Sequence, residues 1–458
     1  MKDIYQQQCL MNKMKRISAF SFCLFAIKLH KVYSIGMKKI DYVLDFCKEL
    51  CKQMIVSGAN IERVNHCVER VCHAYGLHDV TCANLSTRIS ISAKDENKEY
   101  AHRQTDVPPQ AINLERLKKL NDLSFKVVRD TPDPETLYDL LHAIKSNDFP
   151  WWFVMIGFIV AMAGLARIFC AGWQEILIVE LNTLLLFGLS KLISKVHINK
   201  IITNFISMFL VSMIAMGFHA LGFINFYIVC ITNAFFLIPG IPMINCARNL
   251  LCGNEMNGAI DLLKVLLEVL SIVAGIAAAY AILGTLMGEP QIQETFDLRN
   301  NLQAANPWGS SLELIILTLL ASAGFSITFN IQLKDLPFAA LGGVIVRVVY
   351  ILFQLIIPYR FLYTLLAAFF AALYSEILAI VKKEPSTLNL YPAIVPLIPG
   401  DLFYYVALGL VWSNTDLLTQ FGPDLALVLI GISVGFVICS TVVHYVRKFR
   451  FLKIYKTN

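Results

Sequence analysis

Long apolar segments fill most of this chain of 458 residues from residue 151 onward. A helix needs about twenty apolar residues to cross a hydrocarbon core of about 30 Å, and most of these segments are that long. Helices satisfy their own backbone hydrogen bonds, which lipid cannot do. The pattern predicts an α-helical integral membrane protein with ten transmembrane helices, at residues 151–169, 173–192, 203–223, 226–241, 259–287, 312–329, 336–357, 361–381, 392–412 and 425–446.

Charged side chains are concentrated at the start of the chain. Residues 1–150 hold 40 Lys, Arg, Asp and Glu residues, whereas the following 308 residues hold 32. Overall, 57% of residues are hydrophobic and 16% are charged, against about a quarter charged in soluble proteins. This composition excludes a soluble enzyme, a nucleic-acid-binding protein and a disordered chain. It predicts an aqueous domain followed by a membrane domain that contacts lipid.

The aqueous part divides into an extension and a small domain. Residues 1–36 contain an apolar run that is too short to span a bilayer and lacks a signal-peptide cleavage site, so we treat them as an extension and Met37 as an alternative start. Residues 37–148 are expected to form a cytoplasmic α/β domain. Its pattern predicts helices at 40–75, with a break at 57–60, strands at 80–93 and 99–104, and helices at 114–128 and 134–145.

The tetrapeptide Leu-Ile-Pro-Gly occurs twice, at residues 237–240 and 397–400, an offset of 160 residues. The same offset superimposes the first five apolar segments on the last five. It also pairs Gly275 with Gly435, and Ala163-Gly164 with Ala323-Gly324. This agreement predicts a duplicated five-helix unit, with repeats at 149–290 and 308–447.

Each repeat holds an odd number of spans, so the second copy enters the membrane from the opposite side and the repeats are inverted. With the N-terminal domain inside, twelve Lys and Arg residues lie on the inner side and three on the outer side. This bias follows the positive-inside rule and places both termini in the cytoplasm, with 448–458 as a basic tail near the anionic leaflet. The inner cations are Lys191, Lys195, Lys200, Arg248, Lys334, Lys382, Lys383, Arg447, Lys448, Arg450, Lys453 and Lys456, and the outer ones are Arg167, Arg299 and Arg360.

The fourth and ninth spans each contain the Pro-Gly pair, which interrupts the helix. Such a break is tolerated in a membrane only where it lines a cavity or is covered by protein, and the half-helix ends then present partial charges to a substrate or ion. Proline kinks that only shape a bundle are the alternative interpretation, but the recurrence in both halves favours function. The candidate substrate-binding residues near the breaks are Asn233, Pro239, Gly240, Asn245, Arg248, Asn249, Pro399, Gly400 and Asp401.

Charged residues within the spans form a second set of candidates. A charge at the bilayer centre costs about 2.5–3.5 kcal/mol, so it needs a partner or water. Arg347 is a candidate for binding a substrate carboxylate, or it neutralises Glu268 or Glu180. Glu180, Glu268 and Glu376 are candidate proton carriers, although Glu376 alternatively lies near the inner surface. Asp261, Lys264 and Glu268 share one helix face, and Asp261 is expected to pair with Lys264.

Other motifs carry no chemistry. Gly431-Ile-Ser-Val-Gly435 matches the GxSxG pattern of hydrolases, but it lies in an apolar helix, so we interpret it as small-residue packing. His66, Cys67, Cys72 and His73 lie close together without a CxxC pair, which favours an ordinary helix over a zinc site. We find no ATP-binding loop, and we expect no cofactor, no metal, no catalytic residue and no enzyme activity.

The chain resembles the threonine/serine exporter family over residues of about 40–445. The resemblance rests on Ser57-Gly-Ala-Asn60 with Arg63-Val64, Leu85-Ser-Thr-Arg88, Pro108-Pro-Gln-Ala-Ile-Asn-Leu114, Leu237-Ile-Pro-Gly-Ile-Pro242 with Arg248-Asn249-Leu250, and Pro396-Leu-Ile-Pro-Gly400. It implies ten spans in a bacterial inner (plasma) membrane and export of threonine, serine or similar small amino acids driven by the proton-motive force. It also implies that two modules, separate in some bacteria, are fused here.

Two alternatives stay open. Some two-protein relatives are associated with dicarboxylate export, so a succinate-like substrate is the first. A dianion wants more than one cation, whereas a zwitterion wants one cation and one anion, and the span interiors mildly favour the zwitterion. The second alternative is a membrane hydrolase or sensor working through the N-terminal domain, for which no nucleophile with a base is evident. The sequence leaves open whether the chain forms a homo-oligomer.

Overall fold

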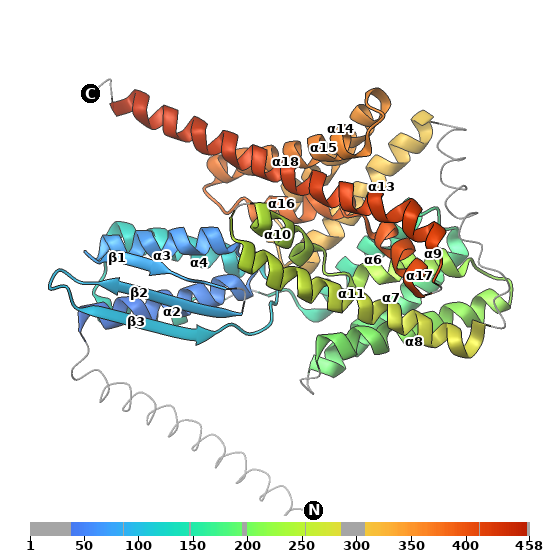
Figure 1. The fold of residues 1–458 in the computed structure, drawn as a ribbon, viewed down its shortest axis with the longest axis horizontal. Helices are drawn as coiled ribbons and strands as arrows, with labels where there is room; N and C mark the ends of the chain where they lie inside the picture. The colour runs from blue at the N-terminus through green and yellow to red at the C-terminus, as the bar shows by residue number, and fades with distance from the viewer. Residues whose placement is uncertain are drawn as a thin grey trace, which may run out of the picture.

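The computed structural model describes residues 38–85, 87–145, 148–194, 199–251, 253–284, 307–411 and 413–455. The predicted extension at 1–36 and the alternative start at Met37 lie outside these residues. The described part comprises a mixed α/β N-terminal unit (residues 38–145) and a larger helical body (residues 148–455), which lie side by side (Figure 1).

The N-terminal unit is a three-stranded antiparallel sheet with helices beside it. Predicted helices at 40–75 and 114–128 are confirmed, and the one at 134–145 is shorter. Asn60 caps the second helix by accepting a hydrogen bond from the Glu62 backbone N–H at 3.0 Å. The elements are α2 (Lys39–Val56), α3 (Ile61–Ala74), β1 (His78–Cys82), β2 (Arg88–Lys94), β3 (Tyr100–Asp106), α4 (Leu114–Asp130), η1 (Pro134–Thr136) and α5 (Leu137–His142).

The single strand predicted at 80–93 is wrong, because the chain reverses within it. Leu85 and Arg88 exchange backbone hydrogen bonds, with Leu85 N to Arg88 O at 2.7 Å, so β1 and β2 form a hairpin. The run of Thr, Cys, Ser and Ile continues across the turn without Gly or Pro, and hydrophobic alternation alone therefore does not locate it.

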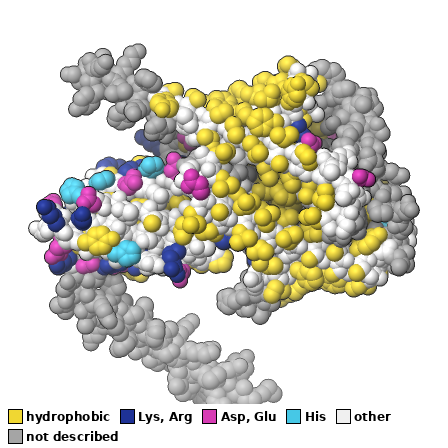
Figure 2. Space-filling model, in the orientation of Figure 1, with side chains coloured by type: hydrophobic (Ala, Val, Ile, Leu, Met, Phe, Trp, Pro, Cys, Tyr) yellow, Lys and Arg dark blue, Asp and Glu magenta, His cyan; other side chains and the backbone are white. Residues whose placement is uncertain are grey.

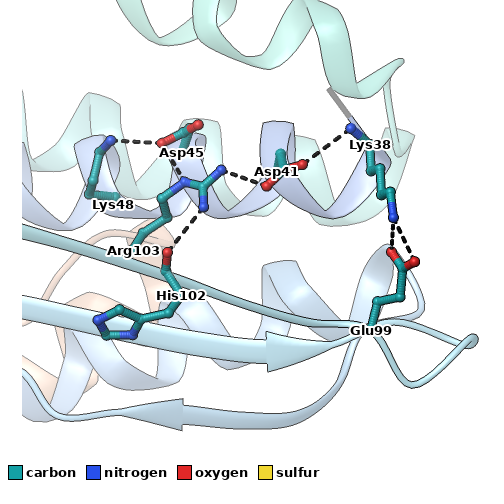
Figure 3. Close-up of polar contacts among 7 residues, drawn as sticks. All are labelled: Lys38, Asp41, Asp45, Lys48, Glu99, His102 and Arg103. Carbon is teal, nitrogen blue, oxygen red and sulfur yellow. Dashed lines mark hydrogen bonds and ion pairs between the residues drawn. The ribbon is translucent and has the colours of Figure 1, made fainter. Parts of the chain in front are cut away.

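Ion pairs connect the sheet to α2. Arg103 on β3 donates from Nη2 to Asp41 at 2.6 Å and from Nε to Asp45 at 3.0 Å (Figure 3). Lys38, just before α2, pairs with Glu99, just before β3. Because the guanidinium holds two carboxylates one helical turn apart, it fixes the register of β3 along α2.

The helical body contains the predicted membrane spans. Within the described residues, eight helices are long and apolar enough to cross a membrane, and two bent pairs raise the number to ten if each pair is one span. Hydrophobic side chains cover the visible face of this body, whereas charged side chains gather over the N-terminal unit (Figure 2). Such an apolar exterior fits lipid rather than water. The elements are α6 (Trp151–Ile168), α7 (Trp173–Ser194), α8 (Lys200–Ala220), α9 (Phe226–Leu237), α10 (Gly240–Leu251), α11 (Glu255–Leu283), α13 (Pro307–Thr328), α14 (Leu336–Ile356), α15 (Arg360–Lys382), α16 (Thr387–Ile394), η3 (Val395–Leu397), α17 (Gly400–Val411) and α18 (Thr415–Tyr455).

The last helix is longer than the predicted span at 425–446. It starts at Thr415 because Pro423 is accommodated inside the helix rather than ending it, and it runs on through part of the predicted tail to Tyr455. Figure 1 shows α18 extending well beyond the other helices at the C-terminal end.

The two Pro-Gly breaks share the backbone conformation of the residue before the proline, although their bend angles differ. We call residues 238–240 the first break and residues 398–400 the second break. The helices bend by 73° between α9 and α10 and by 50° at the second break. Ile238 (φ −63°, ψ 127°) and Ile398 (φ −62°, ψ 125°) are both extended, as steric contact with the following proline requires.

Helix packing also repeats at the 160-residue offset. A Cβ on Gly275 of α11 would lie 2.6 Å from the carbonyl oxygen of Phe205 on α8. A Cβ on Gly435 of α18 would lie 2.5 Å from the carbonyl oxygen of Leu365 on α15, the residue 160 positions after Phe205. Gly431 faces the same helix, so the GxSxG segment is a packing motif, as predicted.

Helices α6 and α13, which open the two halves, cross each other through glycines. Gly164 lies against the Leu317 carbonyl, and Gly324 lies against the Gly157 carbonyl. The later part of α6 therefore meets the earlier part of α13, so the two helices run antiparallel. The offset converts the first of these contacts into the second, which is the pattern of a two-fold relation.

The N-terminal unit docks mainly on the second half of the helical body. Lys118 on α4 donates to Asp335 at 2.9 Å and to Glu384 at 2.7 Å, and the Tyr391 hydroxyl donates to the Gly58 carbonyl at 2.9 Å. Burial lowers the pKa of Lys118, but the bonds to the two carboxylates outweigh it and hold the pKa above its ordinary value. Burial likewise raises the pKa of Asp335, yet Lys118 and Lys382 hold it below its ordinary value.

We predict that Gly324→Ala destabilises the helical body by about 1–3 kcal/mol, because the new methyl group would lie 2.5 Å from the Gly157 carbonyl oxygen. Thermal unfolding in detergent measures the loss. Gly188→Ala is the control, since a Cβ there meets no atom within 4 Å. Equal melting temperatures for the two variants would contradict the close crossing of α6 and α13.

We predict that docking of the N-terminal unit weakens in acid. Because docking lowers the pKa of Asp335, its carboxylate stabilises the docked state. This stabilisation is fully present above pH 3.8, the ordinary pKa of an aspartate, and is lost as the pH falls through the lowered pKa. The pKa of Lys118 is raised, so its ammonium stabilises docking fully below pH 10.5, the ordinary pKa of a lysine. This stabilisation is lost only as the pH rises through the raised pKa, in strong base. Lys118→Met should cost about 3 kcal/mol at pH 7 and flatten the acid dependence.

Limited proteolysis between α5 and α6 across the pH range reports this docking. Lys126→Met, an exposed position on the same helix, is the control. Unchanged protection in Lys118→Met would show that the ion pairs do not hold the unit.

Candidate functional site

Two cavities lie on either side of the place where the Pro-Gly breaks meet. The large cavity, of about 930 Å³, is bounded by the first break, α8 and α13. Its wall is mainly phenylalanine, isoleucine and leucine. Polar groups at intervals in it come from Gln110, Ser190, Lys200, Thr203, Asn204, Ser207 and Thr328. Since Pro109, Gln110 and Ile112 belong to the N-terminal unit, this cavity lies beside that unit.

The small cavity, of about 50 Å³, is bounded by the second break, α14 and α15. Its lining is more polar and includes Arg347, Tyr350, Arg360, Thr364 and Asp401. Arg360 pairs with Asp424 at 3.0 Å and also interacts electrostatically with Asp401. The cations Arg347 and Arg360 and the anions Asp401 and Asp424 therefore balance in formal charge.

Phe235 and Ile398 line both cavities and form the wall between them. A Cβ on Gly240 would lie 2.6 Å from Ile398 Cδ1, and a Cβ on Gly400 would clash with the Phe235 ring. Each break therefore presents its glycine to a side chain of the other half. Only glycine allows this close approach, which explains the Pro-Gly pair at both positions.

Arg347 compensates a backbone group that the second break leaves without its helical partner. The Gly400 N–H bonds to the Ile398 carbonyl at 2.9 Å instead of to Pro396 four residues back. Arg347 Nη2 donates to the Pro396 carbonyl at 3.2 Å, and Nε donates to Thr318 Oγ1 at 3.0 Å. The guanidinium thus stabilises the break and lines the small cavity.

The hydrogen bonds of Arg347 go to Pro396 and Thr318, and its pairing with Glu268 or Glu180 stays a prediction. Glu268 pairs with Lys200 at 2.7 Å. Both carboxylate oxygens of Glu180 are buried without a hydrogen-bond partner among the described residues. Asp261 accepts a hydrogen bond from Asn249 at 3.2 Å, and its pairing with Lys264 stays a prediction. Glu376 interacts with Arg63 of the N-terminal unit, which fits the alternative prediction that Glu376 lies near the surface facing that unit.

Only some of the predicted site residues meet at the cavities. Pro239 and Gly240 line the large cavity, Arg347, Pro399 and Asp401 line the small one, and Gly400 packs on the wall. The predicted asparagines have structural partners instead. Asn233 accepts from Asn182 at 3.1 Å, and Asn245 donates to Tyr391 at 3.4 Å.

Arg248 faces the N-terminal unit, 3.7 Å from Glu62. Lys200, Asn204, Arg360 and Thr364 are among the polar residues of the cavities that were not predicted as site residues. A signal existed, because the 160-residue offset pairs Lys200 with Arg360 and Asn204 with Thr364. No group of three or more His, Cys, Asp or Glu side chains in the described residues is arranged to hold a metal ion.

Comparison with known families gives two matches that together cover most of the chain. Residues 45–283 match the family model ThrE, described as "Putative threonine/serine exporter", and residues 314–442 match ThrE_2, described as "Threonine/Serine exporter, ThrE". The two matched stretches contain the first and the second break, respectively. No curated protein and no solved structure matches the chain.

Proposed function

This chain belongs to the threonine/serine exporter family, and on that premise we propose that it is a secondary active exporter of threonine, serine or similar small amino acids. The observation that carries the proposal is the meeting of both breaks at one wall between two cavities. A transporter needs a polar site inside an apolar body with access from both faces, and broken helices supply such a site.

The antiparallel crossing of α6 and α13 supports the proposal of inverted repeats. The same packing at Gly275 and Gly435 supports a duplicated unit. In that arrangement the two breaks approach one site from opposite directions. We place both termini and the N-terminal unit on the cytoplasmic side of the inner membrane, on the basis of the loop charges.

The charge balance of the small cavity favours a zwitterion. Arg347, Arg360 and Asp401 line this cavity and Arg360 pairs with Asp424, so the second break presents both cations and an anion. A small amino acid brings a carboxylate for the guanidinium and an ammonium for the aspartate, and it adds no net charge. A dicarboxylate, the alternative substrate, would add two negative charges to a balanced site.

For coupling, we propose that Glu180 carries the proton. Its carboxylate has no hydrogen-bond partner among the described residues, so it can bind and release a proton without breaking an ion pair. Glu268 is less suited because Lys200 holds it at 2.7 Å. We assign no hydrolase activity to the N-terminal unit.

We predict that proteoliposomes containing the purified chain take up labelled threonine when a proton gradient is imposed, and that Arg347→Gln lowers the rate at least tenfold. Loss of a hydrogen bond to a charged group costs about 1.5–3 kcal/mol, which corresponds to that factor or more. Glu180→Gln should remove the dependence on the gradient while leaving exchange of labelled for unlabelled threonine.

Lys264→Gln serves as the control, since this exposed residue of α11 lines neither cavity. Melting temperatures of all variants separate loss of function from loss of folding. Uptake of succinate without uptake of threonine or serine would overturn the proposed substrate.

A further inference from the structure

The two cavities are lined by equivalent residues. Of the fourteen residues that line the small cavity, twelve have their counterpart at the 160-residue offset on the wall of the large cavity; the exceptions are Arg347 and Val428. Lys200 corresponds to Arg360, Asn204 to Thr364 and Ser190 to Tyr350. The two spaces are therefore one structural feature present twice, once in each half.

Although their walls correspond, the cavities differ greatly in size, at about 930 Å³ and about 50 Å³. Each cavity has a break, a first helix and a third helix around it, and the large cavity is lined in addition by Pro109, Gln110 and Ile112 of the N-terminal unit. Two equivalent halves in unequal conformations can exchange those conformations, and the exchanged state differs little in its internal contacts.

On the proposed function, we infer that the small cavity is the closed second access path for the cargo, a zwitterionic amino acid, and that it opens on the face opposite the N-terminal unit as the large cavity closes. The antiparallel crossing of α6 and α13 relates the cavities by a two-fold operation, which turns one face of the body into the other. Since the large cavity lies beside the N-terminal unit, its counterpart points away from that unit.

Two contacts lie beside the small cavity. The Phe235 ring packs directly on Gly400, and Arg360 on α15 pairs with Asp424 on α18 at 3.0 Å. At the equivalent position on the open side, Lys200 on α8 pairs with Glu268 on α11. Each half thus has a cation at the start of its third helix that binds an acid of its fifth helix.

Both cavities offer a buried polar atom that has no partner among the described residues. These atoms are Nδ2 of Asn204, which is 2% exposed, and Oγ1 of Thr364, which is fully buried. The two residues are counterparts, and each lines its own cavity. An unpartnered buried polar group costs about 1–3 kcal/mol, and a polar cargo or water reaching either position would remove that cost.

Cysteine accessibility tests the second path. Asn204→Cys and Thr364→Cys are each labelled with a small membrane-impermeant methanethiosulfonate, applied in turn to each face of sealed vesicles, with and without threonine. Without threonine, we expect labelling at 204 from the face of the N-terminal unit and none at 364. Threonine should lower labelling at 204 and raise labelling at 364 from the other face, each several-fold.

Gly188→Cys is the position control, since this exposed α7 residue lines neither cavity and its labelling should not respond to threonine. The unsubstituted chain reports labelling of native cysteines. In a second variant, Arg360 and Asp424 are both replaced by cysteine and joined by a short bifunctional methanethiosulfonate. Position 364 should then stay protected from labelling in threonine, and a reductant that removes the cross-link should restore the rise.

The outcomes distinguish the second path from the proposed function. Threonine transport without any rise at 364, or with both positions rising together, overturns the second path and leaves the exporter function intact. Opposite changes driven by succinate and not by threonine overturn the zwitterionic cargo. Absence of transport for every small amino acid refutes the proposed function itself, whatever the labelling shows.

Discussion

The constraint on which this structure depends is that lipid cannot accept or donate hydrogen bonds. Wherever a helix is interrupted inside an apolar body, the freed carbonyl and amide groups must find partners in protein or in water. In the second half, the Pro396 carbonyl finds Arg347. The arginine is in turn held by Thr318, so one break fixes the position of a charged side chain deep in the helical body. The polar site thus follows from the interruption of the helix.

The two breaks solve the same steric problem together. Each glycine removes a side chain so that a bulky residue of the other half can lie against the backbone, Ile398 on Gly240 and Phe235 on Gly400. The two side chains separate two cavities that both contain polar groups, and they line both of them.

Much of this arrangement is predictable from the sequence, but not the contacts between the halves. Apolar segment lengths predict the helices, and the repeated Leu-Ile-Pro-Gly predicts both breaks, since proline restricts the residue before it wherever it occurs. Asn233 and Asn245, near the first break, line neither cavity. Asn182 and Tyr391 lie close enough to form hydrogen bonds with them instead. Such pairings depend on distant segments. Arg360 was assigned to a loop, and only tertiary packing places it on the wall of the small cavity.

The N-terminal unit precedes the first half in the chain, yet most of its contacts join it to the second. Lys118 and Glu384 are separated by 266 positions, and Gly58 and Tyr391 by 333. During synthesis the unit leaves the ribosome first, and its partners Glu384 and Tyr391 follow only after the eighth span has been made. Its attachment is therefore completed late in assembly, and a chain truncated before Glu384 would lack these two contacts and carry the unit only partly attached.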